Sequence, residues 1–243
     1  MIRASGLAAV LVLLCASAAD AKAVKVERNS KALEFSFDWS SEAAAVPALN
    51  KEFRAKMEKA FKRAAANAAE DAKSAKDMKR DFHPHFYNEG WTTAGQSARL
   101  LSLQGQIGTF TGGAHPNSTD VALLWDRALN RKVDMARLFT SPAGFETVTR
   151  QAYCRALDAE RKKRRQGEDL GAMFGECPKY SELAIAPKDK NGDGRFDTID
   201  FIASPYVAGP YVEGDYEIDL PVTRKLMMAL KPAYRASFKA QPQ

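Results

Sequence analysis

The stretch Leu100–Ser118, with the sequence LLSLQGQIGTFTGGAHPNS, carries the strongest structural signal in this chain. From Leu100 to Thr111 the residues alternate with a period of two, which predicts a half-buried antiparallel strand. The adjacent Gly112 and Gly113, followed by Pro116, end this alternation in a turn. The sequence therefore predicts a strand that runs into a glycine-rich turn, with the other elements placed on either side of it.

The N-terminus has the pattern of a secretory signal peptide. Arg3 is followed by the apolar run Leu7–Ala16 and then by small residues, which is the order of charge, apolar core and cleavage site in such a leader. We expect residues 1–21 to be removed, with cleavage at residue 23 as the alternative. The apolar run is about ten residues, whereas a membrane-spanning helix needs roughly 20. The mature chain is therefore expected to be periplasmic or secreted, without a transmembrane segment.

Cysteine usage fits an oxidising compartment. Removal of the leader takes Cys15 away and leaves Cys154 and Cys177, an even number. In the periplasm or outside the cell, such a pair is expected to form one disulfide. Two buried thiols are the alternative.

Composition and charge are those of an ordinary globular protein. Hydrophobic residues make up 45% of the chain and charged residues 27%, and the net charge is +6. About 220 mature residues can build a hydrophobic core without disulfide scaffolding. The modestly basic balance favours anionic partners at the cell envelope, such as cell-wall polymers. We expect no nucleic-acid partner.

The apolar patterns outside the opening stretch predict both strands and helices. Alternation in Val24–Trp39 predicts a β-hairpin. Pro47 and the three- and four-residue spacing of apolar side chains after it predict a long amphipathic helix, from Pro47 to about Lys76. A second, central helix is predicted to start at Ser141 and Pro142. The predicted fold class is α+β, with antiparallel sheets, these two helices and two lobes.

Residues 189–200, DKNGDGRFDTID, match the twelve-residue calcium loop at six of its characteristic positions, 1, 3, 5, 6, 9 and 12. Gly194 would permit the sharp bend, and the predicted metal ligands are Asp189, Asn191, Asp193, the carbonyl of Arg195, Asp197 and Asp200. Two features favour a metal-free hairpin turn instead. Asp200 stands where the loop requires a bidentate glutamate, and the flanks are typical of strands rather than helices. Calcium would bind with a dissociation constant of about 0.1 to 1 mM.

The common catalytic motifs are absent from the sequence. It contains no G-x-S-x-G elbow, no phosphate-binding glycine loop, no H-E-x-x-H pair and no clustered cysteines. Histidine is the side chain suited to general-base catalysis at physiological pH, so His115 could act as a general base, but its own motif supplies no nucleophile or orienting carboxylate. We therefore assign no catalytic residue. The candidate ligand-binding residues are Thr111, Gly112, Gly113, His115, Tyr206 and Tyr211.

Three segments of the chain resemble the PdaC/RsiV-like family of bacterial envelope domains. Residues 110–115, FTGGAH, are similar to the family signature YTGGAH. Residues 134–139 resemble its Asp-Leu-Phe element before a helix, and residues 205–221 resemble its tyrosine-rich ending. Together with the order of elements, these segments extend the resemblance over nearly the whole mature chain.

The resemblance implies a PdaC-like N-terminal lobe over residues 24–118 and an RsiV-like C-terminal lobe over residues 119–238. Family members include the non-catalytic N-terminal part of a peptidoglycan deacetylase and the extracellular part of an anti-sigma factor that binds lysozyme. The implied function is a non-enzymatic binding module of the bacterial cell envelope. Its partner would be a cell-wall glycan or an envelope protein such as a lysozyme-like hydrolase.

Two other functions are weighed against this leading hypothesis. One is a glycan hydrolase or deacetylase that uses His115 with a carboxylate brought in by the fold. The other is a calcium-stabilised structural protein of the envelope, based on the loop at residues 189–200. The hypotheses differ in whether His115, this loop and the segment with Tyr206 and Tyr211 share one concave face.

Overall fold

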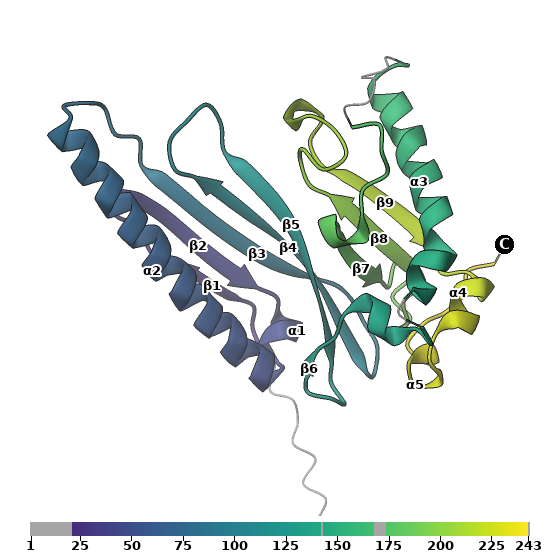
Figure 1. Cartoon of the computed structure of the whole chain (residues 1–243). Coiled ribbons are helices and arrows are strands. Elements are labelled where there is room, and N and C mark those ends of the chain that lie inside the picture. Colours follow the sequence, from purple (N-terminus) through teal and green to yellow (C-terminus); the bar gives the residue numbers. More distant parts are fainter. Residues whose placement is uncertain (1–20, 142, 168–173, 243) are drawn as a thin grey trace, which may run out of the picture.

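The chain folds into two β-sheets that lie side by side, each covered on its outer side by a long helix (Figure 1). The computed structural model describes residues 21–141, 143–167 and 174–242. Residues 1–20 of the predicted signal peptide lie outside this part. The helix α2 (Pro47–Asp77) covers the first sheet, and α3 (Gly144–Arg164) covers the second.

The first sheet has six strands in chain order. They are β1 (Val24–Glu27), β2 (Leu33–Trp39), β3 (His85–Gln96), β4 (Leu100–Phe110), β5 (Asn117–Asp126) and β6 (Arg131–Lys132). The first two form the predicted antiparallel hairpin, and β4 is the strand predicted from the opening stretch. The predicted antiparallel arrangement is wrong at one pair, because β2 and β3 run parallel. A helical crossover through α2 joins these two strands, which is the connection that parallel neighbours require.

The helix α2 packs its apolar stripe on the first sheet. It begins with Pro47, whose fixed φ and missing N–H suit the first helical position. The sequence predicted a helix from Pro47 to about Lys76, and α2 ends at Asp77. Phe53 illustrates the packing, since its ring lies 5.3 Å from that of Trp91 on β3. The resulting first core contains mainly aromatic and aliphatic residues, including Phe35, Phe37, Trp39, Leu49, Phe53, Met57, Trp91, Leu101, Leu103, Leu123 and Trp125.

The second sheet is antiparallel and has three strands, β7 (Ala184–Lys188), β8 (Thr198–Ala203) and β9 (Tyr216–Pro221). One of its faces packs on α3 to form the second core, which includes Phe145, Tyr153, Leu157, Ile199, Phe201 and Tyr216. The remaining elements are short: α1 (Ser41–Ala44), α4 (Arg224–Ala229), α5 (Pro232–Arg235) and the 3-10 turns η1 (Met135–Leu138), η2 (Tyr180–Glu182) and η3 (Tyr211–Glu213).

The strands β4 and β5 contribute side chains to both cores. Leu123 and Trp125 of β5 lie in the first core, whereas Leu124 between them lies in the second. The predicted lobe boundary at residue 118 falls at the start of β5, within the first sheet. Among the described helices, none is long and apolar enough to cross a membrane.

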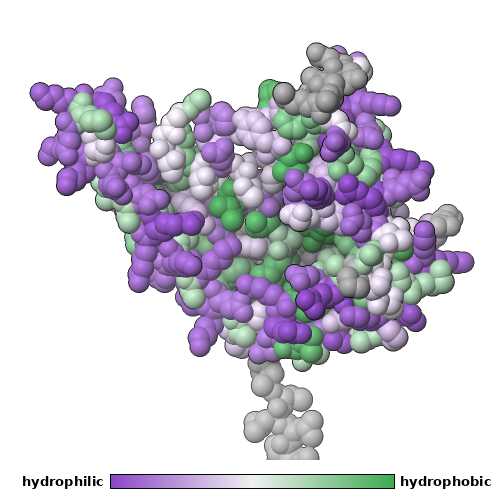
Figure 2. Space-filling model, in the orientation of Figure 1, coloured by the Kyte–Doolittle hydropathy of each residue, from purple (hydrophilic) through white to green (hydrophobic). Residues whose placement is uncertain are grey.

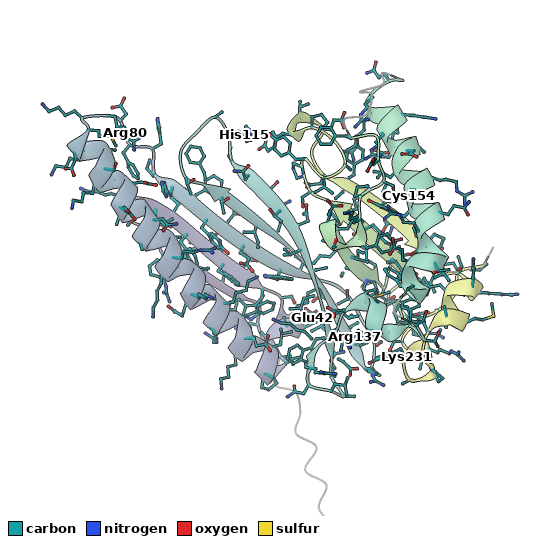
Figure 3. All side chains as sticks on the ribbon, viewed as in Figure 1. Glu42, Arg80, His115, Arg137, Cys154 and Lys231 are labelled. Carbon is teal, nitrogen blue, oxygen red and sulfur yellow. A yellow bond between two sulfur atoms is a disulfide. The ribbon has the colours of Figure 1, made fainter. Side chains whose placement is uncertain are left out.

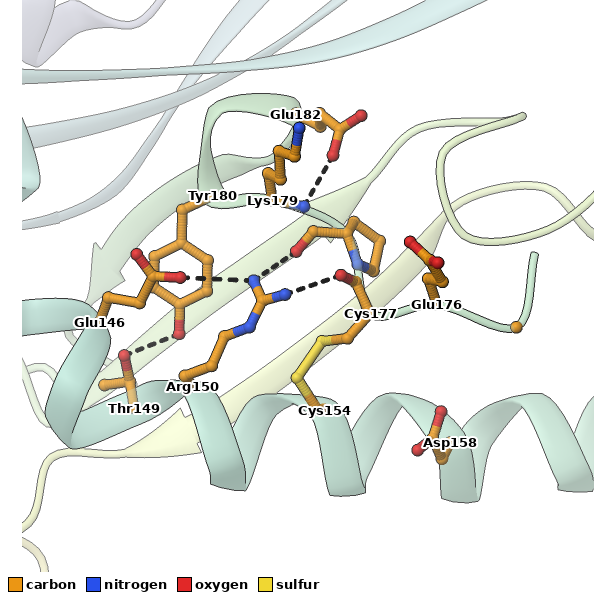
Figure 4. Close-up of a disulfide and its surroundings, with 12 residues drawn as sticks. Glu146, Thr149, Arg150, Cys154, Asp158, Glu176, Cys177, Lys179, Tyr180 and Glu182 are labelled. Atoms are coloured by element: carbon orange, nitrogen blue, oxygen red, sulfur yellow. Dashed lines mark hydrogen bonds and ion pairs between the residues drawn. A yellow bond between two sulfur atoms is a disulfide. The ribbon is translucent and has the colours of Figure 1, made fainter. Parts of the chain in front are cut away.

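The predicted disulfide between Cys154 and Cys177 is present and ties α3 to the segment that leads into η2 (Figure 4). The guanidinium of Arg150, one turn before Cys154, donates hydrogen bonds to the carbonyl oxygens of Cys177 and Pro178, at 2.7 and 2.6 Å. The hydroxyls of Thr149 and Tyr180 are 2.8 Å apart. The segment before η2 is therefore fixed to α3 both by the disulfide and by hydrogen bonds to its carbonyl oxygens.

Replacement of both Cys154 and Cys177 by alanine should lower the free energy of unfolding by about 3 kcal/mol, because the bond joins residues 23 positions apart and restricts the unfolded chain. The midpoint of thermal unfolding should fall by about 6–12 °C for a chain of this size. Differential scanning calorimetry measures this shift, and reduced wild-type protein is the control that should melt with the variant. Equal midpoints for the variant and the oxidised wild type would contradict the prediction.

Candidate functional site

The glycine-rich turn predicted from the sequence connects β4 to β5 at one end of the first sheet. Gly112 and Gly113 have φ angles of 90° and 113°, a region that L side chains rarely adopt. A Cβ atom at either position would meet no atom within 4 Å. The two glycines are therefore required by the backbone path of the turn and not by crowding around it.

His115 leaves this turn and packs against two tyrosines from the segment after β8 (Figure 3). Its ring stacks on Tyr211 with 4.0 Å between centroids, and its Nε2 atom lies 3.3 Å from the hydroxyl of Tyr206. The Nδ1 atom is 2.7 Å from the carbonyl oxygen of Pro116. The structure thus brings together three of the predicted residues, His115, Tyr206 and Tyr211, which we call the His–Tyr cluster.

Tyr206 combines exposure with an unusual backbone. Its side chain is 54% exposed, and its φ of 71° places a non-glycine residue in the left-handed region. The N–H of Tyr206 donates to the carbonyl of Gly209, which closes a tight loop before η3. The surrounding hydrogen bonds hold an aromatic ring at the surface in a backbone conformation that costs about 1–3 kcal/mol.

Thr111 lies apart from the His–Tyr cluster. It lines a cavity of about 270 Å³ against α2, together with Arg63, His85 and Tyr87. The loop at residues 189–200 is also remote, since its Asp189 N–H donates to the carbonyl of Ala94, near the end of β3. That end pairs with the start of β4, whereas the glycine-rich turn follows the end of β4. The predicted residues are therefore divided between opposite ends of the first sheet.

The calcium-like loop connects β7 to β8 and turns around its own carboxylates. Asp189 accepts hydrogen bonds from the backbone N–H groups of Asp193 and Gly194, and Asn191 also accepts one from Asp193. Gly194 has a φ of 81°, as the predicted sharp bend requires. The Asp193 carboxylate lies 2.6 Å from Nζ of Lys239. Every predicted ligand except Asp200 lies in this loop.

Asp200 belongs to β8 and faces the first sheet instead of the loop. Its buried carboxylate accepts a hydrogen bond from Gln104 of β4 and lies 2.6 Å from Nζ of Lys188. Carboxylate oxygens of Asp200, Glu217 and Asp219 all lie within 4.8 Å of one another, and the Lys188 ammonium also pairs with Glu217 at 2.5 Å. Burial raises the pKa of Asp200 to about 6, although Lys188 opposes this shift.

A second acid, the half-buried Asp215, lies next to this group, between the two sheets. Gln106 Nε2 lies 3.3 Å from Oδ1 of Asp120 and 3.4 Å from Oδ2 of Asp215. Ser204 Oγ accepts from the N–H of Asp120 and donates to its carboxylate, at 2.7 and 3.0 Å. Burial, followed by the negative charge of Asp120, raises the pKa of Asp215 to about 6. These side chains form the inter-sheet seam, which consists of Gln104, Gln106, Asp120, Asp200, Ser204 and Asp215.

The sequence reasoning did not find the inter-sheet seam, although it left a signal in β4. Gln104 and Gln106 alternate with apolar residues that enter the first core, which is typical of a strand with one solvent face. The second sheet covers part of that face, leaving Gln104 half-buried and Gln106 exposed, and both glutamines meet carboxylates about a hundred residues away in the sequence. Polar residues on a covered face look the same in sequence as residues in contact with water.

Comparison with solved structures shows the fold of DUF3298 family proteins. One neighbour, a DUF3298 family protein from Pseudomonas aeruginosa PAO1, has a TM-score of 0.56 and 16% identity, covering 90% of this chain and 95% of its own. Another, from Bacteroides fragilis NCTC 9343, has a TM-score of 0.51 and 17% identity, covering 89% and 96%. No curated protein matches the chain.

Residues 26–118 match the family model described as deacetylase PdaC. The match begins in β1 and ends just after the glycine-rich turn. It confirms the resemblance to the PdaC/RsiV-like family that the FTGGAH segment indicated.

The D215N variant should unfold at a higher temperature than wild type near pH 7.5 and at the same temperature near pH 4. An unfolded aspartate titrates near 3.9 and the folded Asp215 near 6, so the native state binds more protons between these values. The stabilising contribution of protonated Asp215 is therefore fully present below about pH 4 and is lost as the pH rises through about 6. The amide keeps the neutral form at every pH.

Thermal melts at both pH values measure this effect. The exposed Asp81 offers the same chemical change in a D81N control, which should leave the difference between the two pH values as in wild type. A D215N variant that is destabilised equally at both pH values would contradict the assigned titration.

Calcium binding by the loop at residues 189–200 stays a prediction. With a dissociation constant of about 0.5 mM, 5 mM calcium should stabilise the protein by about 1.4 kcal/mol and raise its melting midpoint by about 3–6 °C. The D189N variant should lose this shift, because Asp189 stands at the first ligand position. A midpoint that is the same in calcium and in chelator would identify the loop as a metal-free turn.

Proposed function

We propose that this protein is a secreted or periplasmic module of the cell envelope that binds cell-wall glycan through the His–Tyr cluster. The exposed cluster itself is the observation that carries this proposal. Three ring side chains from two distant segments meet there, and each offers an apolar face and a polar edge. Such amphipathic rings suit sugars, whose C–H faces pack on aromatic rings while their hydroxyls hydrogen-bond.

The backbone around the cluster supports a binding role. Gly112 and Gly113 have positive φ angles that few other residues adopt, and Tyr206 is held in a strained backbone conformation. Strained backbone that persists in a folded protein is concentrated at functional positions. Tyr206 and Tyr211 also contact one another, with ring centroids 5.8 Å apart, so the platform is preformed before any ligand arrives.

The surroundings of His115 favour binding over catalysis. Its two ring nitrogens meet the Pro116 carbonyl and the Tyr206 hydroxyl, and no carboxylate forms an ion pair with it in the described part of the chain. A general base in a hydrolase or deacetylase needs a nucleophile or water to activate and a group that orients the ring. Non-enzymatic recognition therefore fits the geometry better than the hydrolase alternative.

The proposed location draws on three independent features. The leader pattern of residues 1–21 is that of an exported protein. The disulfide between Cys154 and Cys177 is of the kind that persists in oxidising compartments. Residues 26–118 match the family model described as deacetylase PdaC, and the resemblance to this family of envelope domains supports an envelope location.

The mature protein should be retained on purified peptidoglycan, and Y206A should reduce its affinity about fivefold, because one aromatic contact contributes about 1 kcal/mol. Y211A should have a similar effect. Co-sedimentation with a titration of sacculi measures the affinity. L129A, at an exposed position in the turn before β6, is the control and should bind like wild type.

Equal retention of Y206A, Y211A and wild type would contradict glycan binding at the cluster. Retention on immobilised lysozyme with none on peptidoglycan would instead indicate an envelope protein as the partner. The same variants then show whether that partner uses the His–Tyr cluster.

A further inference from the structure

A cavity of about 650 Å³ opens between the two sheets on the face shown in Figure 2, where apolar surface gathers in the hollow between them. Its walls are the outer edge of β5, the 3-10 turns η1 and η2, the start of α3 and the start of β7. Apolar side chains such as Leu124, Met135, Phe145 and Leu183 line it. The volume lies within the range of about 300–1,000 Å³ that is usual for ligand sites.

One wall of this groove is an unpaired strand edge. β4 pairs with β5 along its length, whereas β6 pairs only with Trp125 and Asp126. The N–H of Asp120 reaches Ser204 and the carbonyl of Leu124 accepts from Val133, so both point to the outer edge. Because the backbone N–H and carbonyl groups of successive residues alternate between the two edges of a strand, those of Ala122 also point to the outer edge. Among the described residues, nothing hydrogen-bonds to the outward N–H or carbonyl of Ala122.

The opposite wall is a second strand edge. β7 is the outermost strand of its sheet, in the order β7-β8-β9. The carbonyl of Lys188 accepts a hydrogen bond from the N–H of Asp197 and so points toward β8. By alternation, the backbone groups of Pro187 and Ile185 point to the free edge. Proline is tolerated in a strand at such an edge because it has no N–H to pair. Two open edges therefore border one cavity.

The charges at the groove are of one sign. Every charged residue that lines it is acidic, namely Asp120, Asp134, Glu146 and Glu182, in a chain whose net charge is +6. Two of these acids have a basic neighbour on their own element, with Arg137 3.7 Å from Asp134 and Arg150 3.6 Å from Glu146. The guanidinium of Arg150 is directed to the carbonyls of Cys177 and Pro178, away from the groove. A partner with lysine or arginine side chains complements this rim.

We propose that the groove binds a short extended segment of another polypeptide by adding it as a strand to the edge of β5. The N–H and carbonyl of Ala122 supply the central main-chain hydrogen bonds. Alternate side chains of the segment enter the apolar cavity, and the basic side chains between them face the acidic rim. Ser204 and Val133 already occupy the edge on either side, so the pairing is limited to a few residues.

The probe for this site is the peptide acetyl-Lys-Val-Lys-Val-Lys-Val-Lys-amide, titrated into the mature protein and followed by amide chemical shifts. Its binding should shift the Ala122 amide, and the glutamate analogue acetyl-Glu-Val-Glu-Val-Glu-Val-Glu-amide should bind at least tenfold more weakly. A122P removes the outward N–H while leaving the pairing with β4, and should weaken binding at least tenfold. A122S keeps the N–H and should bind within twofold of wild type.

A lysine peptide methylated on alternate backbone nitrogens tests the same hydrogen bonds without changing the protein, in case A122P does not fold. Unaltered binding of the methylated peptide, or equal binding of the lysine and glutamate peptides, would overturn the proposal. So would no binding of the lysine peptide, or slow self-association of the protein that gives the same shift at Ala122. Y206A should leave peptide binding unchanged, which separates this site from the His–Tyr cluster.

Discussion

The structure depends on one strand that supplies side chains to two cores. Successive residues of β5 point to opposite faces of the first sheet. Leu123 and Trp125 therefore enter the core beneath α2, whereas Leu124 enters the core beneath α3. β4 repeats this division, with Leu101 in the first core and Leu100 in the second. The two sheets are thus packed through shared strands, and the loops at their ends acquire fixed positions relative to one another.

The covered face of β4 and β5 becomes polar further from Leu100, and this explains the inter-sheet seam. Gln104 is half-buried against Asp200 of the second sheet, whereas Gln106 stays exposed and reaches Asp215 just before β9. Burial of Asp200 costs desolvation energy, which the Lys188 ammonium offsets in part. Because a buried carboxylate is costly without its partner, any sliding of one sheet over the other is penalised. The seam therefore contributes to a unique arrangement of the sheets more than to their total stability.

Patterns within a short segment predicted most of the elements, and contacts between distant segments account for what was missed. The hairpin in Val24–Trp39 and the start of α2 follow from periodicity and proline. In a chain that is expected to be exported, two remaining cysteines allow only one disulfide. No short segment of the sequence predicts the parallel pairing of β2 with β3, because this pairing depends on the direction in which the chain re-enters the sheet after α2. Asp200 shows the same limit, since its place in the calcium pattern is local but its direction is set by alternation along β8.

A single hydrogen-bonded pair connects the two candidate surfaces. Ser204 directly follows β8 and stands two residues before Tyr206, so its bonds to Asp120 fix the start of the loop that carries the tyrosines. Asp120 also stands at one end of the open edge of β5, where its N–H would otherwise be available to an added strand. Loss of the Ser204 hydroxyl would therefore free one more edge donor and loosen the loop at once. The pair thus sets the position of the His–Tyr cluster and the length of the open edge together.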